Sequence, residues 1–179
     1  MGNLKKFYNN VIKHSLLNKF NYKKITKLPK IDKITLNLDC KQYDSKRIAS
    51  SLLALELITT KRGQINNAKK SSTILKIRKG NPIGCKVCLT KKLNYIFIIK
   101  LLSEVLPKIK NMNDFGIKCN SKNYNSASYT LKNNLIFFEF EDNYYLFNKL
   151  PCLQITISTN SKTKEELMFL LKSLKINAY

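Results

Sequence analysis

The chain has 179 residues, of which 33 are Lys or Arg and 11 are Asp or Glu, so its formal net charge at pH 7 is +22. The composition is 44% hydrophobic, which excludes a disordered polyelectrolyte because such chains lack the apolar side chains that offset the entropy of ordering. No uncharged apolar run reaches the about 18 residues that a membrane-spanning helix requires, so we expect no membrane partner. A folded, strongly basic protein with one domain over residues 1–179 is predicted.

Hydrophobic periodicity divides the N-terminal part, residues 1–92, into helices and strands. Apolar residues three or four apart predict helices, and strict alternation predicts strands with one buried and one wet face. In the strand expected over residues 33–39, Thr35, Asn37 and Asp39 should point outward. The expected elements, in chain order, are a helix over 4–20, this strand, a helix over 45–59, a basic loop or hairpin over 61–80 and a strand over 83–89.

The C-terminal part, residues 93–179, begins with the most apolar helical pattern, over 93–109. The Asn- and Ser-rich stretch 111–134 predicts a long loop. Further strands are expected over 135–140 and 153–158, and Thr163 with Glu166 forms a capping-box pattern that predicts a final helix. The whole pattern predicts an α+β fold, in which helices cover one face of an antiparallel-rich sheet and the other face is polar. In the helix over 93–109 we expect these residues to be buried: Ile96, Phe97, Leu101, Val105 and Leu106.

Cysteine, histidine and carboxylate residues form no catalytic or metal-binding pattern. Cys85 and Cys88 have a metal-like spacing, but the sole histidine, His14, is distant in sequence, and strand positions three apart point to opposite faces. The carboxylates between residues 139 and 142 are typical of a solvated strand end. We therefore predict no enzymatic activity, no bound metal and no cofactor.

Positive charge is concentrated in two segments that contain no acidic residue. Residues 1–31 contain eight lysines, and the interval between Glu56 and Glu104 contains eleven Lys or Arg residues. Uncompensated repulsion disfavours a compact state, so such segments predict a polyanionic partner, and nucleic acid is the leading choice. A polar sheet face beside a basic loop favours a folded RNA that is contacted at its backbone. A free nucleic-acid-binding or processing protein is the alternative.

Six motifs resemble a known family, and the likeness extends over essentially the whole chain. They are Phe7-Tyr8, Phe20-Asn21-Tyr22, Leu28-Pro29-Lys30-Ile31-Asp32-Lys33-Ile34-Thr35-Leu36-Asn37, Ala68-Lys69-Lys70-Ser71, Lys76-Ile77-Arg78-Lys79-Gly80-Asn81-Pro82-Ile83-Gly84-Cys85-Lys86-Val87 and Leu106-Pro107-Lys108-Ile109. In order and nearly in spacing they are similar to large-subunit ribosomal protein family five, the bacterial-type binders of 5S ribosomal RNA. The resemblance implies an α+β structural constituent of the large ribosomal subunit, located in the central protuberance.

The resemblance also implies a set of partners. They are 5S rRNA where it is present, large-subunit rRNA, neighbouring large-subunit proteins, the elbow of the P-site tRNA, and a small-subunit head protein across an intersubunit bridge. By position, the implied RNA-binding residues are Thr35, Asn37, Lys61, Arg62, Lys69, Lys70 and Lys86. The implied tRNA-facing loop contains Ser72, Lys76, Arg78 and Lys79.

Several positions depart from the family pattern. Lys61 stands where the family usually carries a glutamine that contacts RNA, Cys88 replaces a usual threonine, and Thr90 replaces a usual arginine. Lysines at 61, 69 and 70 retain the positive charge, so we expect binding to the RNA backbone to be kept.

The composition also indicates a genomic source. All but three of the 33 basic residues are lysine, and lysine, like the abundant Asn and Ile, has A/T-rich codons. Because the resemblance starts with the first residues of the chain, we expect no targeting extension. We therefore expect a mitochondrially encoded protein of the ribosome in the mitochondrial matrix, with a plastid or an AT-rich bacterium as the alternatives.

Overall fold

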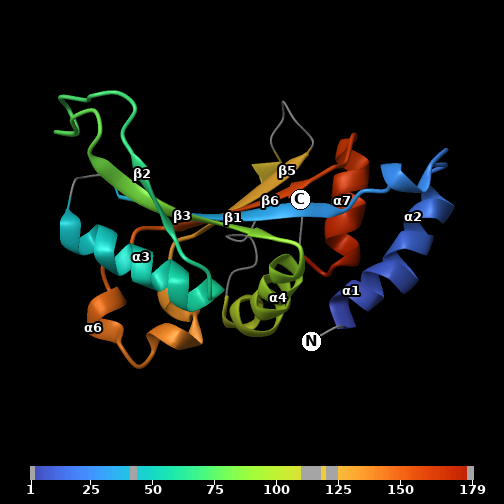
Figure 1. Ribbon diagram of the computed structural model, residues 1–179. Helices are drawn as coiled ribbons and strands as arrows, with labels where there is room; N and C mark the ends of the chain where they lie inside the picture. Colours follow the sequence, from blue (N-terminus) through green and yellow to red (C-terminus); the bar gives the residue numbers. More distant parts are fainter. Residues whose placement is uncertain (1–2, 41–43, 110–117, 120–124, 177–179) are drawn as a thin grey trace. The chain divides into compact units, whose positions relative to one another are not determined.

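The computed structural model describes residues 3–40, 44–109, 118–119 and 125–176. The strands form a six-stranded sheet in the order β2-β3-β1-β6-β5-β4, and both β2 with β3 and β4 with β5 pair antiparallel (Figure 1). The predicted α+β fold with an antiparallel-rich sheet is therefore confirmed. The strands are β1 (Ile31–Asp39), β2 (Gln64–Asn67), β3 (Pro82–Thr90), β4 (Lys118–Cys119), β5 (Ser126–Leu131) and β6 (Leu153–Thr159).

The helices include two composite ones. The first consists of α1 (Asn3–Phe7), the π-helical turn η1 (Tyr8–Ile12) and α2 (Lys13–Lys19), and the second of α4 (Lys92–Lys100), the π-helical turn η3 (Leu101–Val105) and α5 (Leu106–Lys108). The separate helices are α3 (Ser45–Thr59), α6 (Tyr144–Phe147) and α7 (Lys164–Ser173), and the 3₁₀ turns are η2 (Ile25–Lys27), η5 (Asn134–Ile136) and η6 (Phe138–Phe140). None of the described helices is long and apolar enough to span a bilayer.

The chain falls into two compact units. The first comprises residues 1–34, 90–129 and 156–179, and the second comprises residues 35–89 and 130–155. The first unit buries Ile12 and Leu16 of the N-terminal helices and Leu170 of α7. The predicted capping box at the start of α7 is confirmed, because Thr163 and Glu166 exchange both hydrogen bonds.

The second unit builds its core between α3 and one face of the strands. Leu36 and Leu38 of β1 and Val87 of β3 are almost fully buried, as is Leu55 of α3. An aromatic cluster extends this core, with ring centroids 5.9 Å apart for Phe137 and Phe140 and 4.6 Å apart for Phe140 and Phe147. Alternation then leaves the intervening polar residues of β1 and β3 on the other face, as the sequence predicts.

Two predictions of secondary structure are wrong. Residues 135–140, predicted as a strand, form η5 and η6, because Phe137 and Phe140 are buried three positions apart and the Asn133 side chain accepts a hydrogen bond from the Leu135 amide at 3.0 Å. Residues 126–131, predicted as part of a long loop, form β5, whose alternate residues Ala127, Tyr129 and Leu131 are buried. Of that predicted loop, 111–117 and 120–124 lie outside the described residues.

One predicted core residue is exposed. Ile96 is 42% exposed, whereas the other four residues predicted to be buried in this helix are buried. The helix is apolar on several sides, so hydrophobicity alone does not identify its packed face. Asn94 identifies that face, since this side chain is 1% exposed and donates to the Asp32 carbonyl at 3.1 Å.

Thr60, the C-cap residue that follows α3, leads to a stability prediction. Its backbone is left-handed (φ 53°, ψ 22°), a conformation that is costly for a β-branched residue and free for glycine. Thr60→Gly should therefore raise the free energy of unfolding by about 0.5–1 kcal/mol after the added flexibility of the unfolded chain is subtracted, measured by urea denaturation. Ala49→Gly, on the exposed side of the same helix, should instead lower it by about 1 kcal/mol. Equal destabilisation by both variants would contradict the assigned helix end.

Candidate nucleic-acid interface

A hydrogen-bonded polar cluster lies on the face of the second unit opposite α3. The Asn37 amide nitrogen donates to an Asp39 carboxylate oxygen at 2.7 Å, and its amide oxygen accepts from the Asn66 side chain at 3.1 Å. Asn37 and Asn66 are half-buried and Asp39 is exposed. The cluster therefore fixes the orientation of the Asn37 amide and still leaves one N–H and one lone pair of that amide for a ligand.

Gly84 makes this cluster possible. In the sheet β3 lies between β2 and β1, and Asn66 of β2 is paired with Gly84 of β3. A Cβ at Gly84 would lie 2.6 Å from the Leu38 carbonyl oxygen and 3.0 Å from an Asp39 carboxylate oxygen. Because glycine has no side chain, Asn66 can reach across β3 to Asn37 and Asp39 can keep its place.

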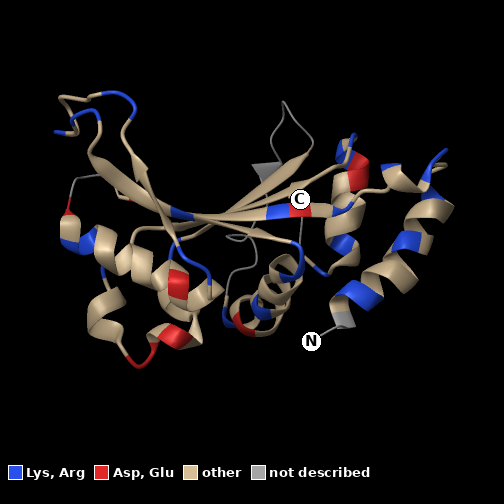
Figure 2. Cartoon of the chain, in the orientation of Figure 1, with Lys and Arg blue, Asp and Glu red and all other residues tan. Residues whose placement is uncertain are grey.

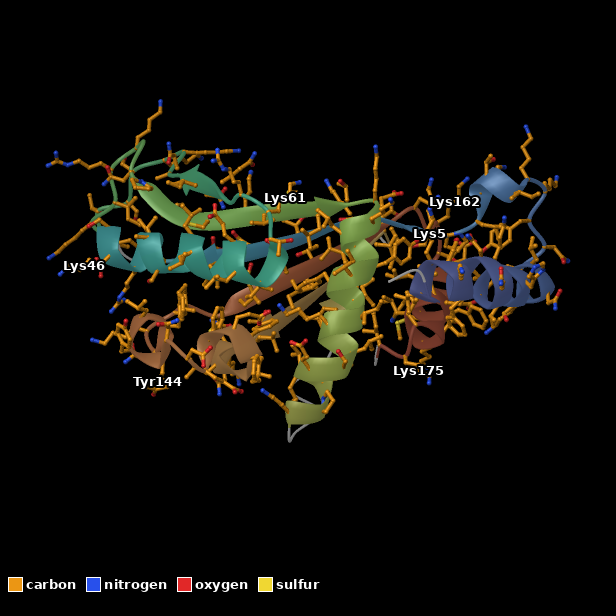
Figure 3. All side chains as sticks on the ribbon, turned by 60° about the horizontal axis from the view of Figure 1, so that its bottom comes forward. Lys5, Lys46, Lys61, Tyr144, Lys162 and Lys175 are labelled. Carbon is orange, nitrogen blue, oxygen red and sulfur yellow. The ribbon has the colours of Figure 1, made fainter. Side chains whose placement is uncertain are left out.

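The remaining residues of the predicted RNA-binding set surround this cluster. Thr35 lies beside Cys88, with Oγ1 and Sγ 3.8 Å apart, and Lys86 lies on the same side of β3 by alternation. Lys61 lies alongside β3, where its ammonium donates to the Cys88 carbonyl at 2.6 Å (Figure 3). Arg62, Lys69 and Lys70 are exposed in the segments that flank β2.

The segment between β2 and β3, residues 68–81, has a backbone frame and is here called the basic loop. At its base, the Ala68 amide donates to the Asn81 carbonyl at 2.8 Å and the Gly80 amide donates to the Ala68 carbonyl at 2.9 Å. Near its tip, Ser72 and Ile77 exchange two backbone hydrogen bonds of 2.9 and 3.0 Å. The buried Ala68 and Ile77 side chains anchor the frame, so the loop presents its other side chains in a defined arrangement.

The basic loop carries positive charge without internal neutralisation. Its lysines and arginine are exposed. They are the blue segments of this loop in Figure 2. Within the described residues, none of them forms an ion pair, whereas Arg47 of α3 does so with Asp44. The charged residues of the loop are Lys69, Lys70, Lys76, Arg78 and Lys79.

The cysteines near this face are not arranged as a metal site. Cys85 points into the core, where its thiol donates to the Ile48 carbonyl at 3.6 Å and burial raises its pKa to about 11. Cys88 lies on the opposite face, beside Thr35. The described residues contain no cluster of three or more His, Cys, Asp or Glu side chains that could hold a metal ion.

Two polar residues of the cluster, Asp39 and Asn66, are absent from the predicted site. Asp39 could have been included, because it lies two positions from Asn37 on one strand and so shares its face. Asn66 could not, because its place depends on the register of β2 with β3 and on the order of the strands. Neither feature leaves a local signal in the sequence.

Comparison with known proteins gives consistent matches over the whole chain. Residues 82–178 match the family model for the C-terminus of the ribosomal L5 family. The chain is 41% identical to the large ribosomal subunit protein uL5m of Reclinomonas americana, over 98% of this chain and 97% of that protein. It is also 38% identical to uL5 of Wigglesworthia glossinidia brevipalpis, over 93% of each chain. A further relative is uL5c of Guillardia theta, with 37% identity over 96% of this chain and 94% of that protein.

The orientation of Asn37 leads to a binding prediction. Asn37→Ala should weaken association with the cognate RNA by about 1–2 kcal/mol, because a half-buried, oriented amide loses a direct hydrogen bond. Filter binding of the purified chain to labelled RNA measures this loss. Asn148→Ala, an exposed asparagine of the same unit that follows α6, is the matched control and should bind like the unmodified chain. Unchanged affinity of the Asn37 variant would show that the Asn37 side chain makes no direct hydrogen bond to RNA.

Proposed function

The chain belongs to the ribosomal L5 family, and from that premise we propose that it occupies the central protuberance of the large ribosomal subunit and binds 5S rRNA there. As a family member it is a structural, non-enzymatic component of the large subunit that binds rRNA and neighbouring ribosomal proteins. The observation that carries the finer proposal is the acid-free basic loop beside a fixed polar cluster on one unit. Family membership sets aside a free nucleic-acid-processing protein.

The polar face and its flanking cations form the proposed rRNA-binding surface, toward 5S rRNA and the adjacent large-subunit rRNA. Cations neutralise phosphates and release counterions, whereas oriented amides and hydroxyls contact base edges and ribose hydroxyls. Asp39 would repel a phosphate, so we assign the centre of the cluster to donor groups on bases or ribose. The surface consists of Thr35, Asn37, Lys61, Arg62, Lys69, Lys70 and Lys86, together with Asp39 and Asn66.

The outer part of the basic loop is the proposed contact with the elbow of the P-site tRNA. Ser72 is fixed by the two backbone hydrogen bonds to Ile77, and Lys76, Arg78 and Lys79 are exposed around them. A framed loop supports this role because it can place cations at a distance from the sheet without first becoming ordered.

A second surface of the same unit, residues 138–146, supports the proposed contact with a small-subunit head protein. Phe138 is 63% exposed, Tyr144 58% and Tyr145 73%, and Tyr144 is labelled on α6 in Figure 3. Three carboxylates lie in this segment, and no Lys or Arg occurs between Lys132 and Lys149, so Figure 2 shows red there. Exposed aromatic side chains beside acidic ones favour a basic protein and disfavour RNA. We therefore assign the intersubunit bridge to this surface.

We further propose that the ribosome in question is mitochondrial. The uL5m of Reclinomonas americana is 41% identical, and the lysine-rich, arginine-poor composition matches A/T-rich coding. The relatives also include the uL5c of Guillardia theta and the uL5 of a bacterium, so a plastid and an AT-rich bacterium are the alternatives. Location of the gene decides among them, and a GC-rich nuclear gene with an upstream presequence would overturn the expectation that the protein is mitochondrially encoded.

Crosslinking in cells tests the proposed RNA partners. The tagged chain should sediment with large ribosomal subunits, and sequencing of RNA crosslinked to it should return 5S rRNA and a segment of large-subunit rRNA. Recovery of large-subunit rRNA alone from particles that contain 5S rRNA would overturn the 5S contact. Sedimentation away from large subunits, with crosslinks spread over messenger RNA, would overturn the ribosomal role itself.

A further inference from the structure

The tip of the basic loop carries an unusual pair of apolar residues. Ile74 is 91% exposed, the highest value among the exposed large hydrophobic residues of the described chain, and its neighbour Leu75 is 46% exposed. Single exposed hydrophobic residues are common and need no explanation. Ile74 differs because the surrounding backbone holds it outward at the end of a framed loop.

The backbone of the tip is a closed turn. The Lys76 amide donates to the Thr73 carbonyl at 3.1 Å, and the paired Ser72 and Ile77 close the turn beneath it. Lys76 has a positive φ of 52°. Turns of this kind normally contain Gly, Asn, Asp, Ser or Pro, and a β-branched apolar residue favours neither the turn nor the solvent. A residue that opposes its local structure in this way is typical of a functional position.

The charges around the tip restrict the kind of surface that Ile74 can meet. Lys76, Arg78 and Lys79 follow it directly, Lys69 and Lys70 precede it, and no acidic residue occurs from Leu57 to Ser103. These cations do not attract a basic or neutral protein surface, whereas RNA can interact with both the cations and the apolar residues of the tip. Its phosphates attract the lysines, and the flat faces of its unstacked bases accept an apolar side chain.

We propose that Ile74, supported by Leu75, packs against the exposed face of a nucleobase in a folded RNA while the flanking cations neutralise phosphates on either side. The inference rests on the proposed function and deepens it, because it identifies the chemical feature that the tip contacts. An exposed base face is offered by the end of a base-pair stack in tRNA and by a loop of rRNA, and the experiment separates these sources.

Photo-crosslinking from position 74 is the direct test. Benzoylphenylalanine replaces Ile74 in the full-length tagged chain, and translating ribosomes that contain it are irradiated. Ile25, which is 67% exposed in a segment that also contains Lys23, Lys24 and Lys27, is the matched control position. RNA adducts at 74 above the level at 25 support the proposal, and their sequence identifies tRNA or rRNA. Adducts to protein alone, or none above the control, overturn it.

Affinity gives a second readout. For the RNA recovered by crosslinking, Ile74→Ser should weaken binding about tenfold, whereas Ile74→Met should bind within about twofold of the unmodified chain, because it keeps an apolar contact. Ile25→Ser should leave the affinity unchanged. An Ile74→Ser chain that binds like the unmodified one overturns the inference and leaves the proposed function intact. If the unmodified chain itself does not join large subunits, the proposed function fails.

Discussion

The unbalanced positive charge between Glu56 and Glu104 is the constraint on which the account depends. Eleven cations and no acid occur in this interval, and within the described residues the cations of the basic loop form no ion pair. Repulsion among them opposes a compact state unless a polyanion is bound. The ribosomal L5 family supplies that polyanion as rRNA. We interpret the excess of lysine over arginine as codon bias, which does not account for the scarcity of acids.

Hydrogen bonds hold the basic loop and the neighbouring polar cluster in defined orientations. The basic loop is held by hydrogen bonds at its base and near its tip, and the Asn37 amide is held between Asp39 and Asn66. Because both groups are already ordered, less conformational entropy is lost when a ligand binds. A larger part of the contact free energy therefore contributes to affinity. The acidic, aromatic segment 138–146 has the opposite character, and we propose a protein partner for it. In this proposal one unit combines surfaces for two chemically different partners.

Local sequence patterns predicted much of this arrangement. Strict alternation placed β1 and β3 and their polar face, and it placed Cys85 in the core and Cys88 outside. It failed at Ile96, since a helix that is apolar on several sides needs tertiary contacts, here those of Asn94, to define its packed face. The Asn66 contact depends on strand order, and the exposure of Ile74 depends on the closed turn. Such long-range geometry is not contained in any local window of sequence.

The salt dependence of RNA binding tests the central claim most directly. Lys69, Lys70, Lys76 and Arg78 are changed together to Glu, and the logarithm of the binding constant is followed against the logarithm of salt concentration. If these four cations neutralise phosphates, the slope should become shallower by about three, as expected for four lost contacts. The control carries the same charge change at Lys162, Lys164, Lys172 and Lys175, which are exposed in the first unit. The slope of the control should change by less than that of the basic-loop variant. Equal slopes for the unmodified chain and the basic-loop variant would contradict the account.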